Sequence, residues 1–441
     1  MVKFAQLPKY EAYKDSGVEW LGEIPKYWNV RKLKYLLKEV NHRSEDGKEN
    51  LLSVSQYTGV TLRSNKLSEG DLLTNAESLE GYKIVKVNDL VSNIMLAWNG
   101  SLGFSNYDGI VSPAYAVYRL NAGLDQQFFH YLLRTDLYKA EYKRQSTGVI
   151  ESRLRLYTDS FYDIFGLLPS AVEQTLIANF LDQKTAQIDA AIAIKEQQIE
   201  LLKERKQIII QQAVTQGLDP NVPMKDSGVD WIGQIPEHWE AVKLSYVAKI
   251  DAGSTPSRSN SSYWGGNIPW IKTGEVNYNT IFGSEECITT AGLKGSSLRL
   301  APIGTLLMAM YGQGVTRGRV AVLGIPATYN QACCGITFKS RINVEFAKFF
   351  FIAAYSYIRD DGNETSQMNL SAGYISNLRI VVPDLDEQSI IIKFLDDLSL
   401  SVDGAVSLQV QQIQKLKEYK TTLINSAVTG KIKITPEMLQ A

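Results

Sequence analysis

A phrase of fifteen residues that occurs twice constrains the fold of this chain more than any other feature. KDSGVEWLGEIPKYW begins at Lys14, and KDSGVDWIGQIPEHW begins at Lys225, 211 residues later. Extending the two copies through Leu36 and Val247 gives 13 identities in 23 aligned positions. A repeat with so long a period indicates two tandem domains rather than a solenoid, whose repeats are much shorter.

A second repeated segment follows each copy of the phrase. The segments that start at Glu173 and Glu387 agree at 19 of 43 positions without a gap, and they contain no proline and almost no glycine. Both are therefore predicted to be long helices. Heptad positions a and d are apolar in both segments, which is typical of a buried seam. These positions are Leu181, Ile188, Ile192, Ile199, Leu202 and Ile209 in the first segment and Leu395, Val402, Val406, Ile413, Leu416 and Leu423 in the second.

The length of these helices favours pairing with each other. A helix of about 40 residues is about 60 Å long, too long to be covered by one half of the chain, so the simplest partner is the other copy, packed antiparallel. Polar residues interrupt the seam at matching places, and such interruptions commonly fix register. They are Thr185 with Ser399, Lys195 with Gln409, and Lys206 with Lys420. Lys206 and Lys420, with the neighbouring Lys203 and Lys417, are also open to two other interpretations, contact with an acidic partner surface or simple solvation of the outer face.

The stretches between phrase and helix differ between the halves. They contain the β-like runs YKIVKV, LLMAM, VAVLG and LRIVVP, separated by clusters of Gly, Asn, Ser and Pro. The predicted fold is α/β, with two mixed α+β domains, two long antiparallel coiled-coil helices and an internal pseudo-two-fold repeat. The expected segments are a first domain over 1–168 with a strap over 14–36, a helix over 169–216, a linker over 217–224, a second domain over 225–382 with a strap over 225–247, a helix over 383–430 and a tail over 431–441.

The repeated phrase is interpreted as a structural strap that anchors each domain to the base of the helices. It places Trp20 and Trp28 around Pro25 in the first half and repeats this pattern in the second. A ligand cage formed by the tryptophans is the alternative, and the repetition in both halves favours the strap.

Composition limits the class of protein without naming a function. The chain is 44% apolar and 21% charged, as in globular proteins. Its 46 Lys and Arg against 47 Asp and Glu count mildly against a nucleic-acid binder unless basic residues are concentrated locally. No apolar run predicts a membrane span, and the N-terminus lacks a signal-peptide pattern. Three cysteines without a CxxC spacing, Cys287, Cys333 and Cys334, favour reduced thiols in a cytoplasm, with no disulfide framework and no zinc site.

The sequence lacks the familiar catalytic constellations. GQGVTR fails the dinucleotide fingerprint because Arg317 occupies the third glycine position, and there is no P-loop. No Pro-Pro of a methyltransferase-like motif occurs, and the three histidines have no spacing that suggests zinc or a triad. Glu204 and Glu418 each stand in a Glu-x-Lys pattern, but both lie inside the heptad segments, where surface ion pairs are expected. We therefore predict a binding role without a cofactor.

The order of motifs resembles the specificity subunit of Type I restriction-modification systems over nearly the whole chain. The resemblance rests on GEIPKYW and GQIPEHW, on GIVSPAYAVY, GSTPSRSNSSYWGGNIPWIKTGEV and GTLLMAMYGQGVTRG, and on the P…EQ…I…FLD pattern that starts at Pro169 and again at Pro383. The first half departs from the family pattern, because LLSVSQYTGVTLRS stands where a G-x-TP…GxIPW stretch is expected. The placement of its recognition loops is therefore less well defined.

The resemblance implies a noncatalytic subunit that recognises double-stranded DNA. Each target-recognition domain would bind one half of a two-part, asymmetric site, and the helices would set the spacing and dock two methyltransferase subunits. Those subunits would in turn recruit motor-endonuclease subunits, and ATP, Mg²⁺ and S-adenosylmethionine would serve these partners. Three alternatives stay open: a subunit of a methyltransferase-only or fused restriction system, a scaffold that binds proteins or glycans, and a nuclease acting through Glu204 and Glu418.

Candidate DNA contacts are Arg, Lys, Asn and Gln on predicted loops. These side chains form hydrogen bonds to base edges, and the cations also neutralise phosphates. For each residue taken alone, a solvated surface group is the favoured interpretation, and packing is favoured for a tyrosine, but some residues of each cluster are expected to contact DNA. The candidates are Arg63, Asn65, Lys66, Lys143, Arg144, Gln145, Arg153 and Arg155 in the first domain and Arg258, Asn260, Tyr263, Lys272, Arg317 and Arg319 in the second.

Overall fold

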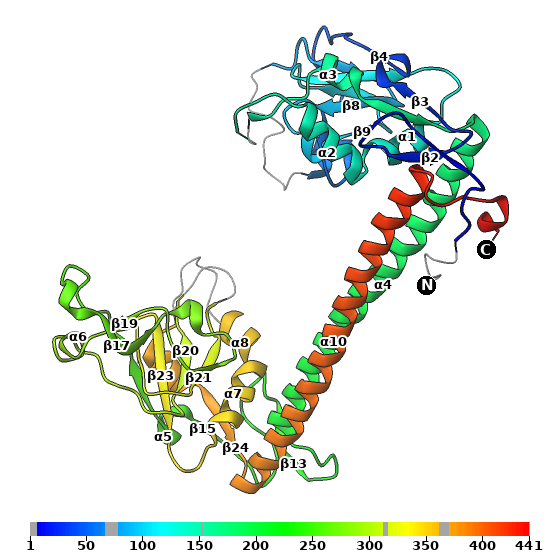
Figure 1. The fold of residues 1–441 in the computed structure, drawn as a ribbon. Coiled ribbons are helices and arrows are strands. Elements are labelled where there is room, and N and C mark those ends of the chain that lie inside the picture. The colour runs from blue at the N-terminus through cyan, green and yellow to red at the C-terminus, as the bar shows by residue number, and fades with distance from the viewer. Residues whose placement is uncertain (1–6, 67–77, 151–152, 312–315, 361–369, 441) are drawn as a thin grey trace. The chain divides into compact units, whose positions relative to one another are not determined.

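The computed structural model describes residues 7–66, 78–150, 153–311, 316–360 and 370–440. The chain forms two compact units. The first comprises Met1–Lys195 and Gln411–Ala441, and the second comprises Glu196–Val410. Each unit therefore contains one mixed α+β domain and one end of each long helix, so the predicted fold class is confirmed. The long helices are α4 (Ala171–Gln216) and α10 (Leu385–Val428) (Figure 1).

The domain of the first unit is built on an antiparallel sheet. Its strand order is β4-β11-β8-β9, and the smaller ladders β1-β2, β3-β12, β5-β6 and β7-β10 surround it. The strands are β1 (Tyr13–Asp15), β2 (Glu23–Pro25), β3 (Asn29–Lys32), β4 (Leu37–Glu39), β5 (Leu52–Ser55), β6 (Gly59–Leu62), β7 (Lys83–Val85), β8 (Asp89–Asn93), β9 (Leu102–Phe104), β10 (Gly109–Val111), β11 (Tyr115–Leu120) and β12 (Phe165–Leu168). The helices are α1 (Gln126–Leu133), α2 (Asp136–Gln145) and α3 (Thr158–Asp163).

The domain of the second unit repeats this plan with additions. The order β16-β23-β20-β21 corresponds to the four-stranded sheet, and β18 joins its edge parallel to β21. A separate sheet, β19-β17-β22, carries the loop that precedes β17. The strands are β13 (Met224–Asp226), β14 (Gln234–Pro236), β15 (Glu240–Lys243), β16 (Ala248–Ala252), β17 (Trp264–Ile271), β18 (Thr280–Ile281), β19 (Cys287–Ile288), β20 (Leu306–Ala309), β21 (Val320–Leu323), β22 (Thr328–Tyr329), β23 (Cys333–Phe338) and β24 (Arg379–Val382). The helices are α5 (Leu244–Val247), α6 (Thr290–Lys294), α7 (Val344–Ala353), α8 (Tyr355–Asp360) and α9 (Ala372–Asn377), and α7 lies between the central sheet and the long helices (Figure 1).

Both straps fold in the same way. Lys14 pairs with Ile24 in the β1-β2 hairpin, and Lys225 pairs with Ile235 in β13-β14. The last tryptophan of each strap is fully buried, and its indole N–H donates to the first glutamate of the following long helix. Trp28 Nε1 lies 3.1 Å from Glu173 Oε2, and Trp239 Nε1 lies 2.7 Å from Glu387 Oε2. These hydrogen bonds support the interpretation of the phrase as a strap.

The glutamine that follows each of these glutamates explains the repeated EQ dipeptide. Gln174 donates to the Pro169 carbonyl (2.9 Å) and accepts from the backbone N–H of Asp125, the residue that caps α1. Gln388 donates to the Pro383 carbonyl (2.9 Å) and accepts from the backbone N–H of Asn343, the cap of α7. Both glutamines are buried, and their amide groups satisfy backbone groups that the helix ends would otherwise leave unpaired.

The long helices pack antiparallel. In the first unit Lys420 Nζ donates to Asp189 (2.7 Å) and Lys195 pairs with Gln412, so higher numbers in α4 meet lower numbers in α10. In the second unit Lys206 Nζ donates to Asp403 (2.8 Å). Lys206 and Lys420 thus pair across the helices, with 22% and 29% of their side chains exposed, so neither is a solvated outer-face charge. Their equivalent pairing supports a role in fixing register.

The twelve apolar positions of the predicted seam are buried or partly buried. None of them is classed as exposed, and Leu181, Leu395 and Leu423 are almost completely buried. Leu181 and Leu423 belong to the core of the first unit, together with Phe128 of α1. Among the described residues, no helix is both long and apolar enough to cross a membrane.

Residues 431–440 of the predicted tail are folded into the first unit. Ile432 and Ile434 are buried in its core, and the backbone N–H of Lys433 donates to the Pro8 carbonyl (2.8 Å). The residues after α10 and the residues before β1 therefore pack together.

Candidate nucleic-acid interface

The loop before β17 holds Arg258 against two tryptophans. The guanidinium carbon lies 3.7 Å from the centroid of the Trp264 ring and 4.9 Å from that of Trp270, within the range of a cation–π interaction. The two indoles meet edge to face at 5.1 Å. Each ring is also fixed by its N–H, which donates to the carbonyl of Ser257 (3.1 Å) for Trp264 and of Ser254 (2.9 Å) for Trp270. The support under Arg258 is therefore rigid.

A pair of glutamates joins Arg258 to Lys272. Arg258 Nη1 donates to Glu286 Oε2 (2.5 Å), while Lys272 Nζ lies 2.9 Å from Glu285 and 3.2 Å from Glu286. The hydrogen bond from Arg258 lowers the pKa of the Glu286 carboxyl, and the hydrogen bonds that Lys272 donates to Glu285 and Glu286 raise the pKa of Lys272. Two of the predicted residues are thus brought together on one surface.

Asn260 and Tyr263 hold the same loop in shape. Asn260 Oδ1 accepts from the backbone N–H (3.1 Å) and the hydroxyl (2.7 Å) of Ser262. The Tyr263 carbonyl accepts from the backbone N–H of Thr289 (2.9 Å), and the Tyr263 side chain is partly buried. Both residues stand beside Arg258 in sequence, and these contacts give the loop one conformation.

Arg317 and Arg319 lie before β21, at another edge of the second domain. Arg317 donates to the Arg359 carbonyl, and Arg319 Nη1 donates to Asn277 Oδ1 (2.8 Å) with its guanidinium 5.8 Å from the Tyr278 ring. The Nε of Arg319 is buried without a hydrogen-bond partner among the described residues. Tyr278 has a φ of 62°, an uncommon backbone conformation for a bulky residue.

In the first domain, three candidates cluster at the end of α2. Arg144 makes two hydrogen bonds to the buried Glu141, at 2.7 and 2.6 Å, and Gln145 donates to the same carboxylate (2.9 Å). Lys143 Nζ lies 5.9 Å from the Trp98 ring. The side chain of Arg144 is nevertheless 65% exposed, so its outer edge faces solvent.

The remaining first-domain candidates fall in two places. Arg155 forms a two-way backbone bridge with Thr147 (3.0 and 2.9 Å), which places Arg155 on a hairpin after α2, with the exposed Arg153 two residues before it. Arg63 is partly buried next to β6, and its Nε has no hydrogen-bond partner among the described residues. The side chains of Asn65 and Lys66 lie outside the described part of the chain.

The histidines are dispersed. His130 is largely enclosed, and burial, followed by the nearby Arg134 charge, lowers its pKa to about 4. His238 contacts Glu387 (3.0 Å) beside the strap, and His42 is exposed. Within the described residues, no group of three or more His, Cys, Asp or Glu side chains is placed to hold a metal ion.

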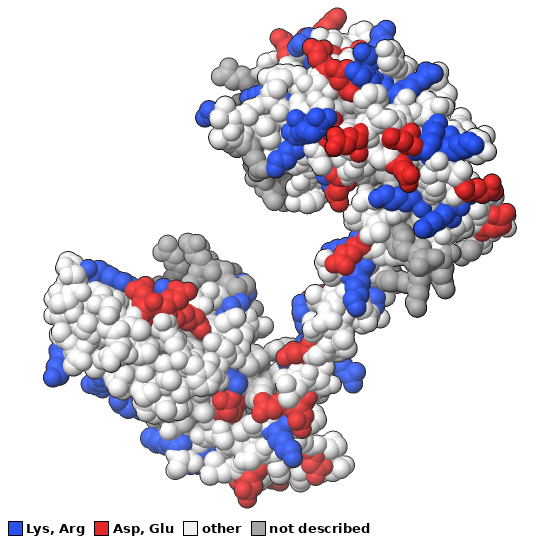
Figure 2. Space-filling model, in the orientation of Figure 1, with Lys and Arg blue, Asp and Glu red and all other residues white. Residues whose placement is uncertain are grey.

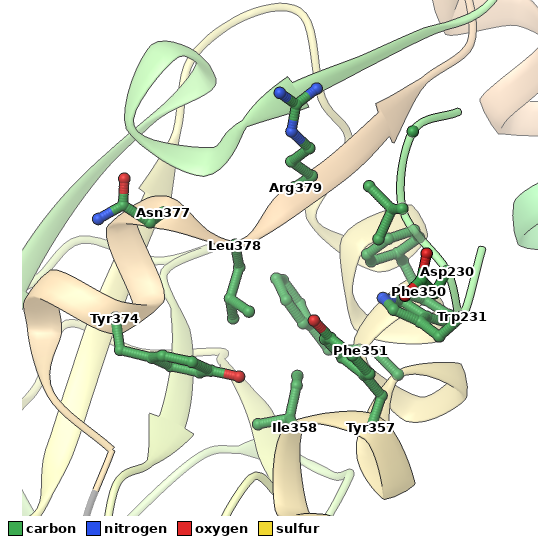
Figure 3. A pocket seen from close by; sticks show the side chains of 13 residues that line it. Asp230, Trp231, Phe350, Phe351, Tyr357, Ile358, Tyr374, Asn377, Leu378 and Arg379 are labelled. Atoms are coloured by element: carbon green, nitrogen blue, oxygen red, sulfur yellow. The ribbon is translucent and has the colours of Figure 1, made fainter. Parts of the chain in front are cut away.

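The two domains have similar mixtures of surface charge, but they differ in the cavity beside the strap. On the face drawn in Figure 2, Lys and Arg are interspersed with Asp and Glu in both units. The second unit has a cavity of about 330 Å³ beside its strap, with Trp231 and Tyr357 facing Tyr374 across it (Figure 3). The matching place beside Val18–Trp20 in the first unit is lined by charged groups, Glu19, Glu141, Arg144 and Asp163.

The sequence missed the partners that position its candidates. Trp270 and Glu286 hold Arg258, Asn277 holds Arg319, and the buried Glu141 holds Arg144 and Gln145. The i,i+3 spacing of Glu141 and Arg144 on α2 is a local signal that could have shown their pairing. No such signal exists for Glu286, because it lies 28 residues from Arg258 and meets it only through the fold.

The comparisons with known proteins agree on one class. Residues 236–418 match the model of the Type I restriction modification DNA specificity domain. The MjaIX specificity subunit of Methanocaldococcus jannaschii is 31% identical over 175 residues, which are 38% of this chain and about 40% of the length of that one. The MjaVIII specificity subunit of the same organism is 25% identical over 456 residues and covers 98% of this chain and 99% of its own.

Solved structures show the same fold. A chain solved for the structural basis of complex assembly and conformational transition of the type I R-M system has a TM-score of 0.70 at 14% identity, covering 92% of this chain and 98% of that one. The HsdS subunit from Thermoanaerobacter tengcongensis has a TM-score of 0.56 at 15% identity, covering 93% and 98%. Two unlike domains on a repeated helical frame are therefore the fold that this chain shares with these structures. The chain is thus similar to Type I restriction enzyme specificity subunits, over residues 236–418 by the family model and over 98% of its length by these relatives.

Proposed function

We propose that this chain is the noncatalytic DNA-recognition subunit of a Type I restriction-modification complex. Each domain binds one half of a two-part site on double-stranded DNA, and the antiparallel helices determine the distance between the halves. Because the subunit acts on chromosomal DNA, its place is the cytoplasm. Methylation and cleavage belong to the partner subunits.

The observation that carries this proposal is one frame that presents two different surfaces. The strap, the EQ dipeptide and the seam make equivalent contacts in both units. The candidate contact loops differ: the second domain presents Arg258 on Trp264, and the first presents Arg144 on Glu141. Two unlike surfaces on equivalent supports are suited to two unlike half-sites, so the target is expected to be asymmetric.

The paired helices are the proposed docking site for two methyltransferase subunits, which then recruit motor-endonuclease subunits. The formal charge of −1 leaves little long-range attraction for DNA in this chain alone. Affinity is therefore expected to rise sharply when a methyltransferase subunit is added.

Salt dependence provides the first test. Binding of the purified chain to random-sequence duplexes is measured by fluorescence anisotropy between about 50 and 200 mM salt, with and without a methyltransferase subunit. A DNA-binding subunit loses affinity steeply with salt because bound counterions are released. Retention that does not respond to salt, or no DNA binding at any salt, contradicts the proposal.

Mapping of methylated adenines in a host that carries the system is the second test. The proposal predicts a two-part asymmetric motif with an unspecified gap, which disappears when this gene is deleted. Cleavage of DNA by the purified chain with Mg²⁺ alone would instead support the nuclease alternative through Glu204 and Glu418.

A further inference from the structure

We infer that Arg258 recognises a guanine in the half-site bound by the second domain, and that Trp264 and Glu286 hold its guanidinium in the orientation this contact needs. The inference rests on the proposed function and adds to it one base and one residue.

The Arg258 side chain is held in one orientation by two contacts. Arginine loses considerable rotamer freedom when it is ordered, so a contact made by a mobile arginine is weaker than one made by a preordered arginine. Here the guanidinium lies on the Trp264 face at 3.7 Å, and Nη1 is bonded to Glu286 at 2.5 Å. Two constraints from different directions, a ring face below and a carboxylate at one edge, fix the plane and the rotation of the group.

Part of the Arg258 guanidinium remains available to bind a ligand. A guanidinium carries five N–H donors, and stacking leaves all of them in its plane. One is used by Glu286, and Nη2 and Nε donate to no residue that the structure describes. The side chain is 54% exposed. A planar donor pair with a free outer edge matches the O6 and N7 acceptors that guanine presents in the major groove.

Arg341, Arg379 and Arg319 of the second unit are held differently from Arg258. Arg341 pairs with Glu240 at the surface, and Arg379 donates to the Ala241 carbonyl. Arg319 lies 5.8 Å from a tyrosine ring, too distant for close stacking. Among the described residues, Arg258 has the closest cation–π contact, and its loop is further fixed by Asn260.

A phosphate contact is the competing role, and Arg258→Lys separates the two. Lysine keeps the positive charge but lacks the planar fork, so it replaces arginine at a phosphate much better than at a guanine. The conservative variant also leaves a cation over the Trp264 ring, which preserves packing of the loop.

The experiment is selection from a random duplex library at low salt by the full chain in complex with a methyltransferase subunit, followed by sequencing of the bound fraction. Variants Arg258→Lys, Arg258→Ala and Glu286→Gln are compared with wild type, with Arg341→Lys as the control on the same domain. Thermal unfolding of each variant checks that the fold is intact.

The expected result is a guanine preference at one position of one half-site that falls about 10- to 100-fold in both Arg258 variants. Every other position keeps its preference, Glu286→Gln loses part of the same preference, and Arg341→Lys loses none. If the Arg258 variants select the same motif as wild type, whether with uniformly weaker binding or with unchanged binding, the inference is overturned. Selection of no motif by wild type overturns the proposed function itself, so the two failures are distinguishable.

Discussion

The frame and the surfaces of this molecule have diverged to different degrees. In the frame, the two units repeat the same contacts: each strap tryptophan donates to the first glutamate of a long helix, at 3.1 Å in one unit and 2.7 Å in the other. On the candidate contact surfaces, the two units share neither the loop sequence nor the partners of the arginines. Arg258 lies on the Trp264 indole, whereas Arg144 is bound by the Glu141 carboxylate of its own helix.

Substitutions are expected to have larger structural effects in the frame than on the surface loops. A substitution in the frame alters a contact on which both domain and helix depend, because the strap and the EQ dipeptide join three elements at one point. A substitution on a loop such as Ser257–Trp264 alters only the loop. Proteins of this plan can therefore change one binding surface while the other surface and the support stay fixed.

The frame itself is not fully symmetric. Tyr10 donates to Glu173 (2.6 Å) in the first unit, where the N-terminal segment and the C-terminal tail pack together. In the second unit His238 contacts Glu387 Oε2 (3.0 Å), the same oxygen that accepts from Trp239, and the chain before the strap is the linker. More aromatic rings line the cavity beside the second strap, and more charged side chains line the equivalent place in the first.

The largest expected effect comes from removing the strap tryptophans. Trp28→Ala and Trp239→Ala are each expected to lower the free energy of unfolding by about 3–5 kcal/mol, because each replaces a fully buried indole and removes one hydrogen-bond donor from the glutamate carboxylate. Chemical denaturation followed by circular dichroism measures both losses. Equivalent straps predict similar losses in the two variants.

Tyr27→Ala is the control for this pair, because Tyr27 adjoins Trp28 but is 83% exposed. It is expected to change stability by less than about 0.5 kcal/mol. A loss below about 1 kcal/mol for either tryptophan variant would show that the strap does not anchor its domain, and the proposed equivalence of the two units would fail.

Acid is expected to affect the units unequally. His130, five residues after the cap of α1, has a pKa of about 4, well below the value of about 6.5 in an unfolded chain. Its contribution to stability is therefore complete above about pH 6.5 and is lost as pH falls toward 4, by on the order of 2–3 kcal/mol, because the unfolded state binds the proton more tightly. Lys348 occupies the same position relative to the cap of α7.

Stability of wild type and His130→Asn is measured by denaturation between pH 4 and 7. In wild type the backbone N–H of Phe104 donates to His130 Nδ1 (3.4 Å). The asparagine keeps an acceptor for this N–H but cannot take up a proton between pH 4 and 7. Its stability curve should be flatter than that of wild type. His42→Asn, at an exposed position, serves as the control, and identical pH profiles for wild type and His130→Asn would refute the assignment.

Sequence alone predicted the repeated parts of this fold well. The heptad pattern picked out twelve positions that are all buried or partly buried, because burial between two long helices selects apolar residues at fixed spacing. The β-like runs LLMAM and VAVLG correspond to β20 and β21. Repetition of the strap indicated a structural role, and hydrogen bonds from Trp28 and Trp239 account for it.

The candidate site was predicted by residue type but not by arrangement. Arg258 and Lys272 were found because cations on loops suit DNA, yet their connection through Glu286 depends on pairing between β17 and β19. Such long-range pairing leaves no periodic trace in the sequence. Lys206 and Lys420 were left open between three roles, because helix pairing alone decides which side chains meet Asp403 and Asp189.

The smallest expected effect tests whether these two lysines fix the helix register. Lys206→Asp places two carboxylates together across the helices and is expected to cost about 1 kcal/mol, because the pair is partly exposed and screened. Adding Asp403→Lys should restore most of the loss, and the same exchange at Lys420 and Asp189 should behave alike. A double-mutant cycle from denaturation curves measures the coupling. Lys203→Asp is the control, since Lys203 pairs with Glu200 of its own helix. A double exchange no more stable than the single change would exclude a register role.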